Sequence, residues 1–404
     1  MPQEINYDPR VLGERLVMAR KAAGKTQEEA ASFLGISRPT YIAIEKGTRP
    51  TQADELVRLA AFFQRSVHEL IRPGAPVALE PHLRGVIDPN HRDATELFEA
   101  IEYLQRFAED YKELERLLDA PLYANYPPEV RLPTRADLRQ FAEDVASNER
   151  IRLQLGDQPI PDLRKVLESE VGVRVFYGKL PAVIAGMYAY VPELGYCTLI
   201  NIAHPPERRR ASLGHEYAHF LIDRHKPGVD YLSQGGRKPA NERFAEAFSL
   251  AFLVPQIGLR RQFNDILHHT GDFRVADLVR LSTFYYVSVQ AMALRLEHLS
   301  LIGKGWWDYL KEAGFRSNAA KEELRVEQDA TESFKPYPER YEFLAVHAFE
   351  RKLISEGQLA RFLRCDRVDA RRIVKECLTR IETEDGVARP MQLPFEKSLL
   401  TDAR

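Results

Sequence analysis

Residues 211–222 read ASLGHEYAHFLI and place His215 and His219 four residues apart, with Glu216 directly after the first histidine. On a helix, residues four apart lie on one face, so both imidazoles can reach the same ion. Neutral imidazole is a good zinc ligand, and the pair predicts two ligands of a tetrahedral site. Glu216 can then take a proton from a metal-bound water without coordinating the metal. The alternative is a buried helix with two hydrogen-bonded histidines.

The third metal ligand has three candidates. His225 lies six residues after His219, but a continuing helix turns it about 120° away from the metal face. Ile222 lies between His219 and His225. It is β-branched and resists the turn that would bring His225 back to the metal. A second apolar helix begins NERFAEAF and carries Glu242 and Glu246 one turn apart. Either carboxylate can complete a site of two histidines and one carboxylate, which leaves the fourth position for water.

Composition sets limits on the rest of the chain. With 404 residues, 44% hydrophobic and 29% charged, we expect a globular protein of roughly two to four domains. The net charge of −2 indicates no global affinity for nucleic acid, so any DNA contact needs a local patch. No apolar run approaches the ~18 residues of a membrane span, and the N-terminus is no signal peptide. Three scattered cysteines (Cys197, Cys365 and Cys377) form no metal-type pair, and we expect a cytoplasmic protein.

Residues 9–71 have the pattern of five short helices. Thr26 and Glu29 form a capping box at the start of a helix over 27–34. Gly35 then turns the chain, and Ser37 caps the next helix over 38–46. Further helices are predicted over 9–23 and 51–63.

The sequences TQEEAA (26–31), LGIS (34–37) and IEKG (44–47) resemble the helix-turn-helix domain of the Xre/Cro repressor family, over essentially all of residues 9–71. In such domains the third helix enters the major groove with its N-terminal residues facing base edges. The resemblance implies base contacts by Arg38, Thr40 and Tyr41, with Gln27 at the groove edge, and phosphate contacts by Lys25, Lys46 and Arg49. Residues 1–72 hold 11 Lys and Arg against 9 Asp and Glu. A fold used only for protein contacts is the alternative, because this domain is weakly basic.

Residues 73–131 combine a linker with a long helix. Four prolines in 73–92 indicate the linker. Residues 93–119 then carry apolar side chains in a four-three alternation, which is a heptad seam: Leu97, Ile101, Leu104, Ala108, Tyr111, Leu114 and Leu118. This helix either joins two copies, since repressors of this type read two half-sites as dimers, or packs against its own chain.

Residues 132–303 form the candidate catalytic domain. Helices are predicted over 134–155 and 160–170, and strands over 173–177, 185–191 and 196–202. The metal helix follows. A small sheet leading into a zinc-binding helix is typical of peptidases, in which an edge strand holds an extended peptide beside the metal.

This domain resembles the ImmA/IrrE family of zinc metallo-endopeptidases. The matching features are Leu155-Gly156 with Pro159-Ile160 and Leu163, Leu167-Glu168 with Gly172-Val173, Ile200-Asn201, Arg210 to His219, and Glu242-x-x-Ala245-x-x-Phe248 with Phe252-Leu253-Val254-Pro255. The resemblance implies that Glu242 is the third zinc ligand and that Glu246 is a partner of a metal-binding histidine. Family members are cytoplasmic, are often fused to Xre-type domains, and typically cleave a partner repressor to derepress genes after stress or in mobile elements. Glu246 replaces the usual Asn or Asp, and Tyr217 the usual Leu, but neither change removes a ligand.

The last hundred residues are predicted as a separate helical part. Trp306 and Trp307 belong to an aromatic cluster expected to be buried, and 311–338 is expected to be a loop or linker. Residues 355–373 align without gaps with 26–44 and resemble a second helix-turn-helix unit. Arg364 replaces the glycine of the turn, and Asp369 and Arg371 take base-reading positions. A protein-contact or sensing role is as reasonable for this unit as DNA binding.

Together these patterns predict an α+β, mostly helical chain with four parts: a five-helix Xre-type domain (1–72), a linker and long helix (73–131), a zincin-like peptidase domain with a small sheet (132–303), and a helical, helix-turn-helix-like domain (304–404). We expect a DNA-binding, homodimeric transcription regulator that uses Zn²⁺ to cleave a protein substrate, such as a helix-turn-helix repressor. Double-stranded operator DNA is its other expected partner, and no membrane is involved. The alternative is a regulator whose peptidase-like domain only senses a ligand or peptide.

Overall fold

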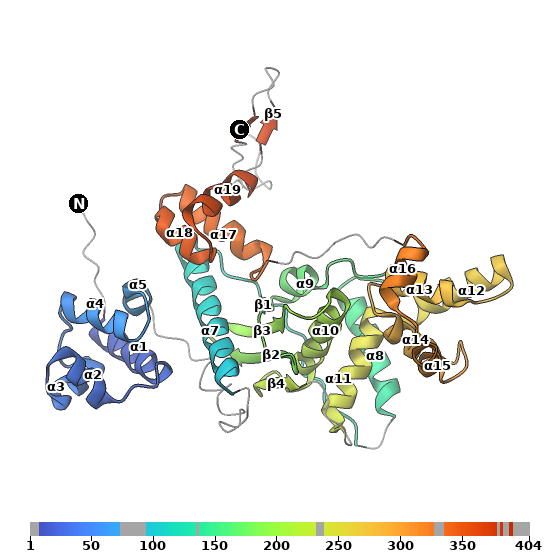
Figure 1. The fold of residues 1–404 in the computed structure, drawn as a ribbon, viewed down its shortest axis with the longest axis horizontal. Coiled ribbons are helices and arrows are strands. Elements are labelled where there is room, and N and C mark those ends of the chain that lie inside the picture. Colours follow the sequence, from blue (N-terminus) through green and yellow to red (C-terminus); the bar gives the residue numbers. More distant parts are fainter. Residues whose placement is uncertain are drawn as a thin grey trace.

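The computed structural model describes residues 8–72, 94–134, 137–231, 238–326, 335–377, 380–382 and 388–390. The predicted linker over 73–92 lies outside these residues. In the described part, the chain is mostly helical, with a four-stranded sheet near its centre (Figure 1). The predicted α+β, mostly helical class is confirmed. Among the described helices, none combines the length and apolar character needed to cross a lipid bilayer.

The N-terminal domain contains the five predicted helices: α1 (Pro9–Ala22), α2 (Gln27–Leu34), α3 (Arg38–Glu45), α4 (Ala53–Phe62) and α5 (Val67–Ile71). Thr26 and Glu29 form the predicted capping box, and Gly35 ends α2 in the left-handed region at φ 74°. A Cβ atom on Gly13 would lie 2.3 Å from the carbonyl oxygen of Glu45. Glycine at this position therefore lets α1 cross the end of α3 closely.

The sheet has the order β1-β3-β2-β4, in which β1 is parallel to β3 and the other pairs are antiparallel. Its strands are β1 (Arg174–Gly178), β2 (Ile184–Val191), β3 (Gly195–Asn201) and β4 (Gly228–Tyr231). The three predicted strands are present. The sequence did not predict β4, because four residues are too few to establish an alternating pattern.

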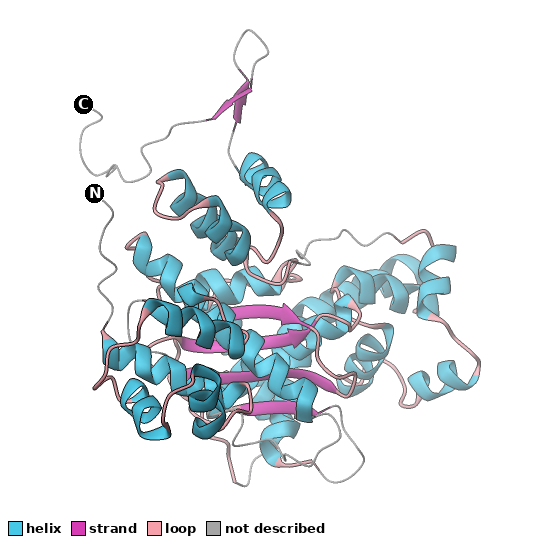
Figure 2. Cartoon of the chain, turned by 60° about the vertical axis from the view of Figure 1, so that its left-hand side comes forward, coloured by secondary structure: helices cyan, strands magenta, loops and turns pink. Residues whose placement is uncertain are grey.

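Helices cover both faces of the sheet (Figures 1 and 2). Along β3, Tyr196 and Ile200 pack into one apolar cluster, and Cys197 and Leu199 pack into another on the opposite face. This alternation follows from the two-residue period of a strand. The first cluster includes side chains of α8 (Leu138–Arg152), α10 (Pro206–Asp223) and α11 (Ala240–Leu253), and the second includes those of α7 (Ala94–Leu117) and α17 (Glu339–Glu350).

The long helix α7 packs against its own chain. It contacts β1, β3 and α17. Six of the seven predicted seam residues are buried: Leu97, Ile101, Leu104, Ala108, Tyr111 and Leu114. The seventh, Leu118, lies just beyond the end of α7 and is half-buried. The intrachain alternative is therefore confirmed for this seam.

Further helices complete the central part. They are α9 (Leu163–Val166), the π-helical turn η1 (Leu167–Val171), α12 (Gln256–Thr270), α13 (Val275–Phe284), α14 (Val289–His298), α15 (Trp306–Glu312) and α16 (Ser317–Glu323). The prediction that the aromatic cluster is buried is wrong for Trp306, which is 44% exposed, and for Tyr309, which is 61% exposed. A seven-residue helix buries only one side, and here Leu310 is the residue of α15 that is fully buried. The predicted loop over 311–338 contains α16, which packs against α13.

The C-terminal unit consists of α17, α18 (Glu356–Phe362) and α19 (Arg367–Cys377), followed by a hairpin of β5 (Arg380–Glu382) and β6 (Ala388–Pro390). The carboxylate of Asp110 on α7 links this unit to the N-terminal domain. It binds Arg72 after α5, and it also binds Arg361 and Arg364 of the C-terminal unit at 3.3 and 2.6 Å. Asp110 is 1% exposed. Its buried negative charge is therefore stabilised by the positive charges of these arginines instead of by water.

We expect Asp110→Ala to lower the free energy of unfolding by about 3–5 kcal/mol, because it removes the closest carboxylate of the buried Arg72 and the carboxylate that Arg361 and Arg364 share. Denaturant unfolding followed by circular dichroism measures the change. Asp272→Ala is the control, because its exposed pair with Arg274 is worth at most about 1 kcal/mol. Equal losses in the two variants would contradict the role of Asp110.

Candidate metal centre

Three side chains from α10 and α11 converge on one point. The Nε2 atoms of His215 and His219 are 3.1 Å apart. The carboxylate of Glu242 lies 3.2 Å from Nε2 of His215 and 3.3 Å from Nε2 of His219. These residues form the group of metal-ligating side chains found in the described part of the chain. The four-residue spacing of the histidines predicted that they share one face of α10. The packing of α11 against α10 then brings the carboxylate of Glu242 to this face.

The geometry of this cluster fits zinc. Ligands at about 2.0–2.1 Å from a tetrahedral zinc ion are separated from one another by about 3.3 Å. The two Nε2 atoms are 3.1 Å apart, and each lies at a similar distance from one oxygen of Glu242: Oε2 for His215 and Oε1 for His219. Two imidazoles and one carboxylate are also a donor set that hydrolytic zinc sites use. Hydrogen bonds from His215 and then His219 hold the pKa of Glu242 well below its usual range. The carboxylate is therefore charged, as a ligand must be.

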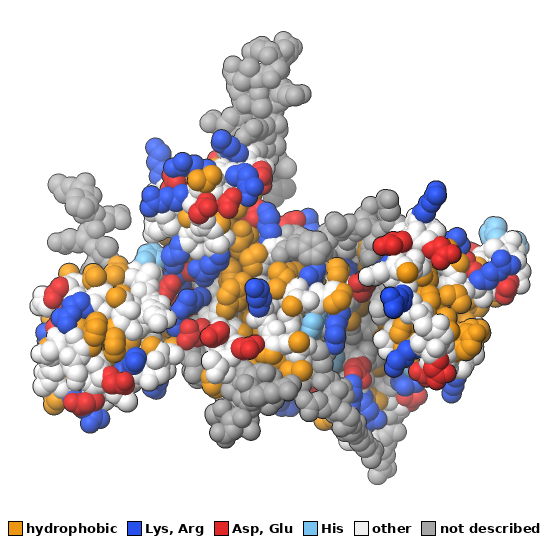
Figure 3. Space-filling view, in the orientation of Figure 1, with side chains coloured by type: hydrophobic (Ala, Val, Ile, Leu, Met, Phe, Trp, Pro, Cys, Tyr) orange, Lys and Arg blue, Asp and Glu red, His pale blue; other side chains and the backbone are white. Residues whose placement is uncertain are grey.

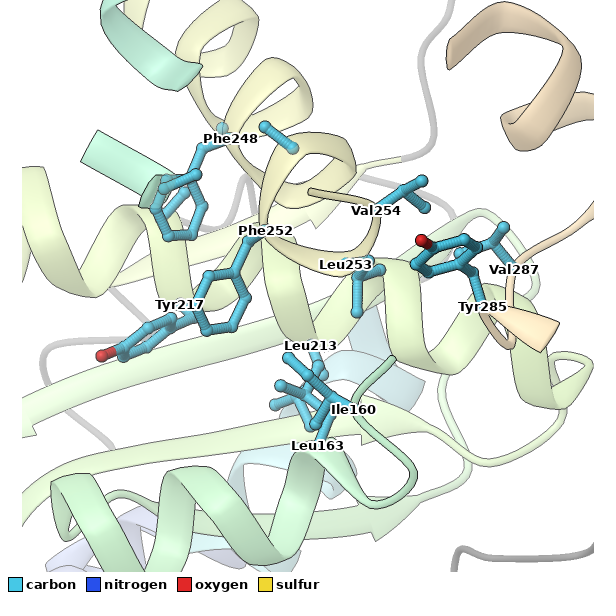
Figure 4. Packing of buried hydrophobic residues seen from close by; sticks show 14 of the residues in the cluster. Ile160, Leu163, Leu213, Tyr217, Phe248, Phe252, Leu253, Val254, Tyr285 and Val287 are labelled. Atoms are coloured by element: carbon cyan, nitrogen blue, oxygen red, sulfur yellow. The ribbon is translucent and has the colours of Figure 1, made fainter. Parts of the chain in front are cut away.

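Small residues bring α10 and α11 close together. A Cβ atom on Gly214 would lie 2.6 Å from Oγ of Ser249 on α11, and this hydroxyl donates to the carbonyl oxygen of Ala211 at 2.9 Å. About one turn further along α10, Tyr217 packs with Phe248 and Phe252 of α11 (Figure 4). This packing fixes the position of Glu242 relative to the histidines.

Tyr217 stands where Leu is usual, and the structure explains why a tyrosine fits at this position. Its ring is buried, and a buried tyrosine needs a partner for its hydroxyl. The hydroxyl donates to the carboxylate of Glu149 on α8 and accepts from Arg152 at 3.3 Å. The larger residue therefore ties α10 to α8 and leaves the cluster intact.

Glu216 is fully buried between α10 and the sheet. A Cβ atom on Gly186 of β2 would lie 2.6 Å from its Oε1 atom, so any other residue at this position would displace the carboxylate. On the backbone side, the hydroxyl of Tyr196 donates to the carbonyl oxygen of Glu216 at 2.9 Å. The strand and the helix together fix the carboxylate of Glu216 against Gly186, and Glu216 directly follows His215 of the metal cluster.

Tyr188 of β2 is a residue of this site that the sequence reading missed. Its ring stacks on His219, with centroids 5.4 Å apart and planes 15° apart. Gly228 lies opposite it in β4, where a Cβ atom would approach the ring to 2.5 Å. The alternation in β2 places Tyr188 on the same face as Gly186, but only the pairing of the strand with α10 brings this face to the cluster.

The two other predicted candidates lie outside the cluster. His225 has a side chain 62% exposed and lies 3.8 Å from Glu129, which agrees with its exclusion as a ligand. Glu246 is exposed and pairs with Lys238. The prediction that Glu246 partners a metal-binding histidine is therefore wrong: residues four apart share a face of α11, but Glu246 lies one turn, about 6 Å, further along the helix, where its carboxylate binds Lys238.

The residues predicted to bind DNA lie on and around α3. Arg38 and Lys46 are exposed, and Thr40 is half-buried. The prediction that Tyr41 contacts a base is wrong, because its side chain is fully buried in the core of the N-terminal domain. Tyr41 and Ile44 are three residues apart and share the inner face of the helix.

Two further residues predicted to contact DNA already bind side chains of the N-terminal domain itself. The side-chain amide of Gln27 donates to Glu45 at 2.7 Å. The guanidinium of Arg49 binds both carboxylate oxygens of Glu55, at 2.8 and 3.0 Å. A phosphate contact by Arg49 therefore has to compete with Glu55, whereas Arg38 and Lys46 are available.

Comparison with known proteins matches two regions of the chain. Residues 168–297 match the model of the IrrE N-terminal-like domain, and residues 16–70 match a helix-turn-helix model. No curated protein matches the chain. The crystal structure of ComR from Streptococcus suis aligns over 92% of this chain and 88% of its own, at 12% identity and a TM-score of 0.16, a likeness too low to support any conclusion. The chain joins an Xre-type helix-turn-helix domain to a domain of the ImmA/IrrE peptidase family.

Proposed function

We propose that this protein is a DNA-binding transcription regulator whose ImmA/IrrE-type domain is a zinc-dependent endopeptidase. The observation that carries the proposal is the cluster of His215, His219 and Glu242, together with the buried carboxylate of Glu216, the residue that directly follows His215. A structural zinc site needs four protein ligands, whereas three ligands leave a position for water. A base next to the ligands is the further part that hydrolysis requires.

The side chains have separate roles in this proposal. Zinc held by the cluster would polarise a peptide carbonyl and acidify a bound water. The carboxylate of Glu216, which is not a ligand, would accept a proton from the attacking water and donate it to the leaving amine. Tyr188 keeps the ring plane of His219 fixed by stacking on it. These roles agree with the distances and burial at the site.

The sheet provides a place for an extended peptide. β4 is the edge strand next to β2, and β2 carries Gly186 and Tyr188 beside the cluster. A peptide that pairs with the side of β4 on which no described strand lies extends the sheet by main-chain hydrogen bonds. We therefore propose a protein substrate, with a helix-turn-helix repressor as the first candidate.

Incubation of the zinc-loaded protein with repressors encoded beside its gene tests the proposed activity. Discrete fragments of one repressor are expected, and mass spectrometry identifies the bond that is cleaved. If no repressor is cleaved but added peptides change the affinity for DNA, the domain is a sensor and the endopeptidase proposal fails.

The proposed DNA contacts predict a separate result. We expect Arg38→Ala and Thr40→Ala to relax base preference, with each lost base contact costing about 1–3 kcal/mol. Selection of binding sites from random duplexes by each variant measures the preference at every position. Lys21→Ala, an exposed residue of α1, is the control and keeps the wild-type preference. Identical selected sites for Arg38→Ala and wild type would contradict this assignment.

A further inference from the structure

The C-terminal unit repeats the geometry of the N-terminal helix-turn-helix. Ser355 and Gln358 form a capping box at the start of α18, as Thr26 and Glu29 do at the start of α2. Arg364 takes the left-handed conformation of the turn at φ 53°, at the position equivalent to Gly35. The resemblance found in the sequence therefore extends to the caps and the turn.

The inner face of α19 also corresponds to that of α3. Ala370 is fully buried where the aligned residue of α3, Tyr41, is fully buried. Ile373, aligned with Ile44, is half-buried and packs against the same cluster as α17 and α18. Three packed helices, with the third turned outward, are the arrangement in which helix-turn-helix domains present a recognition helix.

Two arginines fix this unit to the body of the protein. Arg361 and Arg364 both bind the buried carboxylate of Asp110 on α7. A non-glycine residue in the left-handed region costs roughly 1–2 kcal/mol, and the ion pair at 2.6 Å offsets this cost for Arg364. The unit is therefore held with α18 toward α7, which leaves the outer face of α19 uncovered in the described part of the chain.

The outer face of α19 is basic. Residues at positions i, i+1, i+4, i+5 and i+8 share one face of a helix, and on α19 these residues are all exposed: Arg367, Val368, Arg371, Arg372 and Lys375. Figure 3 shows Lys and Arg side chains gathered over this unit. The four cations and one apolar side chain match a major groove, in which phosphates flank the floor and thymine methyl groups offer apolar contacts.

Local ion pairs do not neutralise this face. Arg371 pairs with Glu356 at 2.9 Å, and Arg372 pairs with Asp369 at 2.7 Å and with Glu376 at 4.0 Å. Both arginine side chains are more than half exposed, at 63% and 66%. Exposed pairs of this kind contribute at most about 1 kcal/mol. Both arginines can therefore exchange their carboxylate for a phosphate, unlike Arg361 and Arg364.

We propose that α17, α18 and α19 form a second DNA-binding helix-turn-helix unit, and that the outer face of α19 binds the major groove of double-stranded DNA. Arg371 and Arg372 contact phosphates, so Arg371 does not have the base-reading role that the sequence alignment suggested, and Val368 faces the bases near the N-terminus of the helix. This inference goes beyond the proposed function, which assigns DNA binding to residues 1–72. One chain then contacts DNA through two recognition helices, both joined to α7.

The salt dependence of DNA binding tests this proposal in the full-length, zinc-loaded protein. The probe is a mixed-sequence duplex of about 30 base pairs, and the slope of log K against log salt counts the phosphates that are neutralised. Arg371→Ala/Arg372→Ala is expected to reduce this slope by about 2. Arg371→Lys/Arg372→Lys keeps both charges and should keep the slope.

The matched control is Arg274→Ala/Arg280→Ala. It removes two exposed arginines with similar local ion pairs on or next to α13, so it changes the net charge equally. Its slope should equal that of wild type. Thermal unfolding by circular dichroism establishes that each variant is folded, since the four substituted side chains are all more than half exposed.

A variant with weakened α3 distinguishes the DNA contacts of α19 from those of α3. Arg38→Ala/Lys46→Ala weakens binding through α3, and the binding that remains should disappear when Arg371→Ala/Arg372→Ala is added. An unchanged slope for Arg371→Ala/Arg372→Ala, in either background, would overturn the proposal and indicate that α19 contacts a protein instead.

Discussion

Glu216→Gln is expected to keep its zinc and to lose peptide hydrolysis. Glutamine has nearly the same shape as glutamate, so the buried side chain still fits beside Gly186, but an amide cannot accept the proton of the attacking water. General acid-base catalysis contributes typically about 10²–10⁴-fold, and we expect the rate of repressor cleavage to fall by at least this factor. Metal analysis and cleavage by the same sample measure both effects.

Glu207→Gln is the matched control for this variant. Glu207 lies on the same helix, but its carboxylate pairs with Lys321 at 2.7 Å, outside the metal cluster. Its rate should remain close to that of wild type. Cleavage by Glu216→Gln at the wild-type rate would show that another group is the base.

Glu242→Ala is expected to lose its zinc and all activity. Even changes to the indirect partners of metal ligands cost about 10–100-fold in metal affinity, so the loss of one of three ligands should exceed this range. Glu246→Ala and His225→Ala are the controls, because their side chains pair with Lys238 and Glu129 instead. Both should bind zinc as wild type does.

Titration of each variant with zinc, followed by a competing chelator, measures these affinities. The three variants test the ligand assignment against the alternatives that the sequence left open. Zinc retained by Glu242→Ala and lost from His225→Ala or Glu246→Ala would reverse the assignment.

Local signals predicted much of this fold. Capping residues and the left-handed Gly35 act within one or two turns of a helix, so α2 and α3 begin where the sequence indicates. The four-residue spacing of His215 and His219 likewise determines a shared face on any helix. The parts of the site that the sequence predicted best are those that lie within a single helix.

The contacts between elements were harder to predict. The heptad pattern of α7 indicates only that one face of this helix is apolar. In the structure, this face packs against the sheet and α17 of the same chain. The contact of Tyr188 with His219 depends on how β2 lies against α10. Tyr41 was assigned by analogy of position, although a helix turns this residue toward the core. Each of these outcomes depends on tertiary packing, which periodicity in a single element does not specify.

The dependence of repressor cleavage on bound zinc tests the central claim most directly. The metal-free protein is titrated with zinc, and the rate is measured at each occupancy. The proposed site predicts no cleavage without metal, a rate that rises in proportion to bound zinc, and a plateau at one ion per chain. Cleavage by the metal-free protein, or no cleavage of any partner repressor by the fully loaded protein, would contradict the claim.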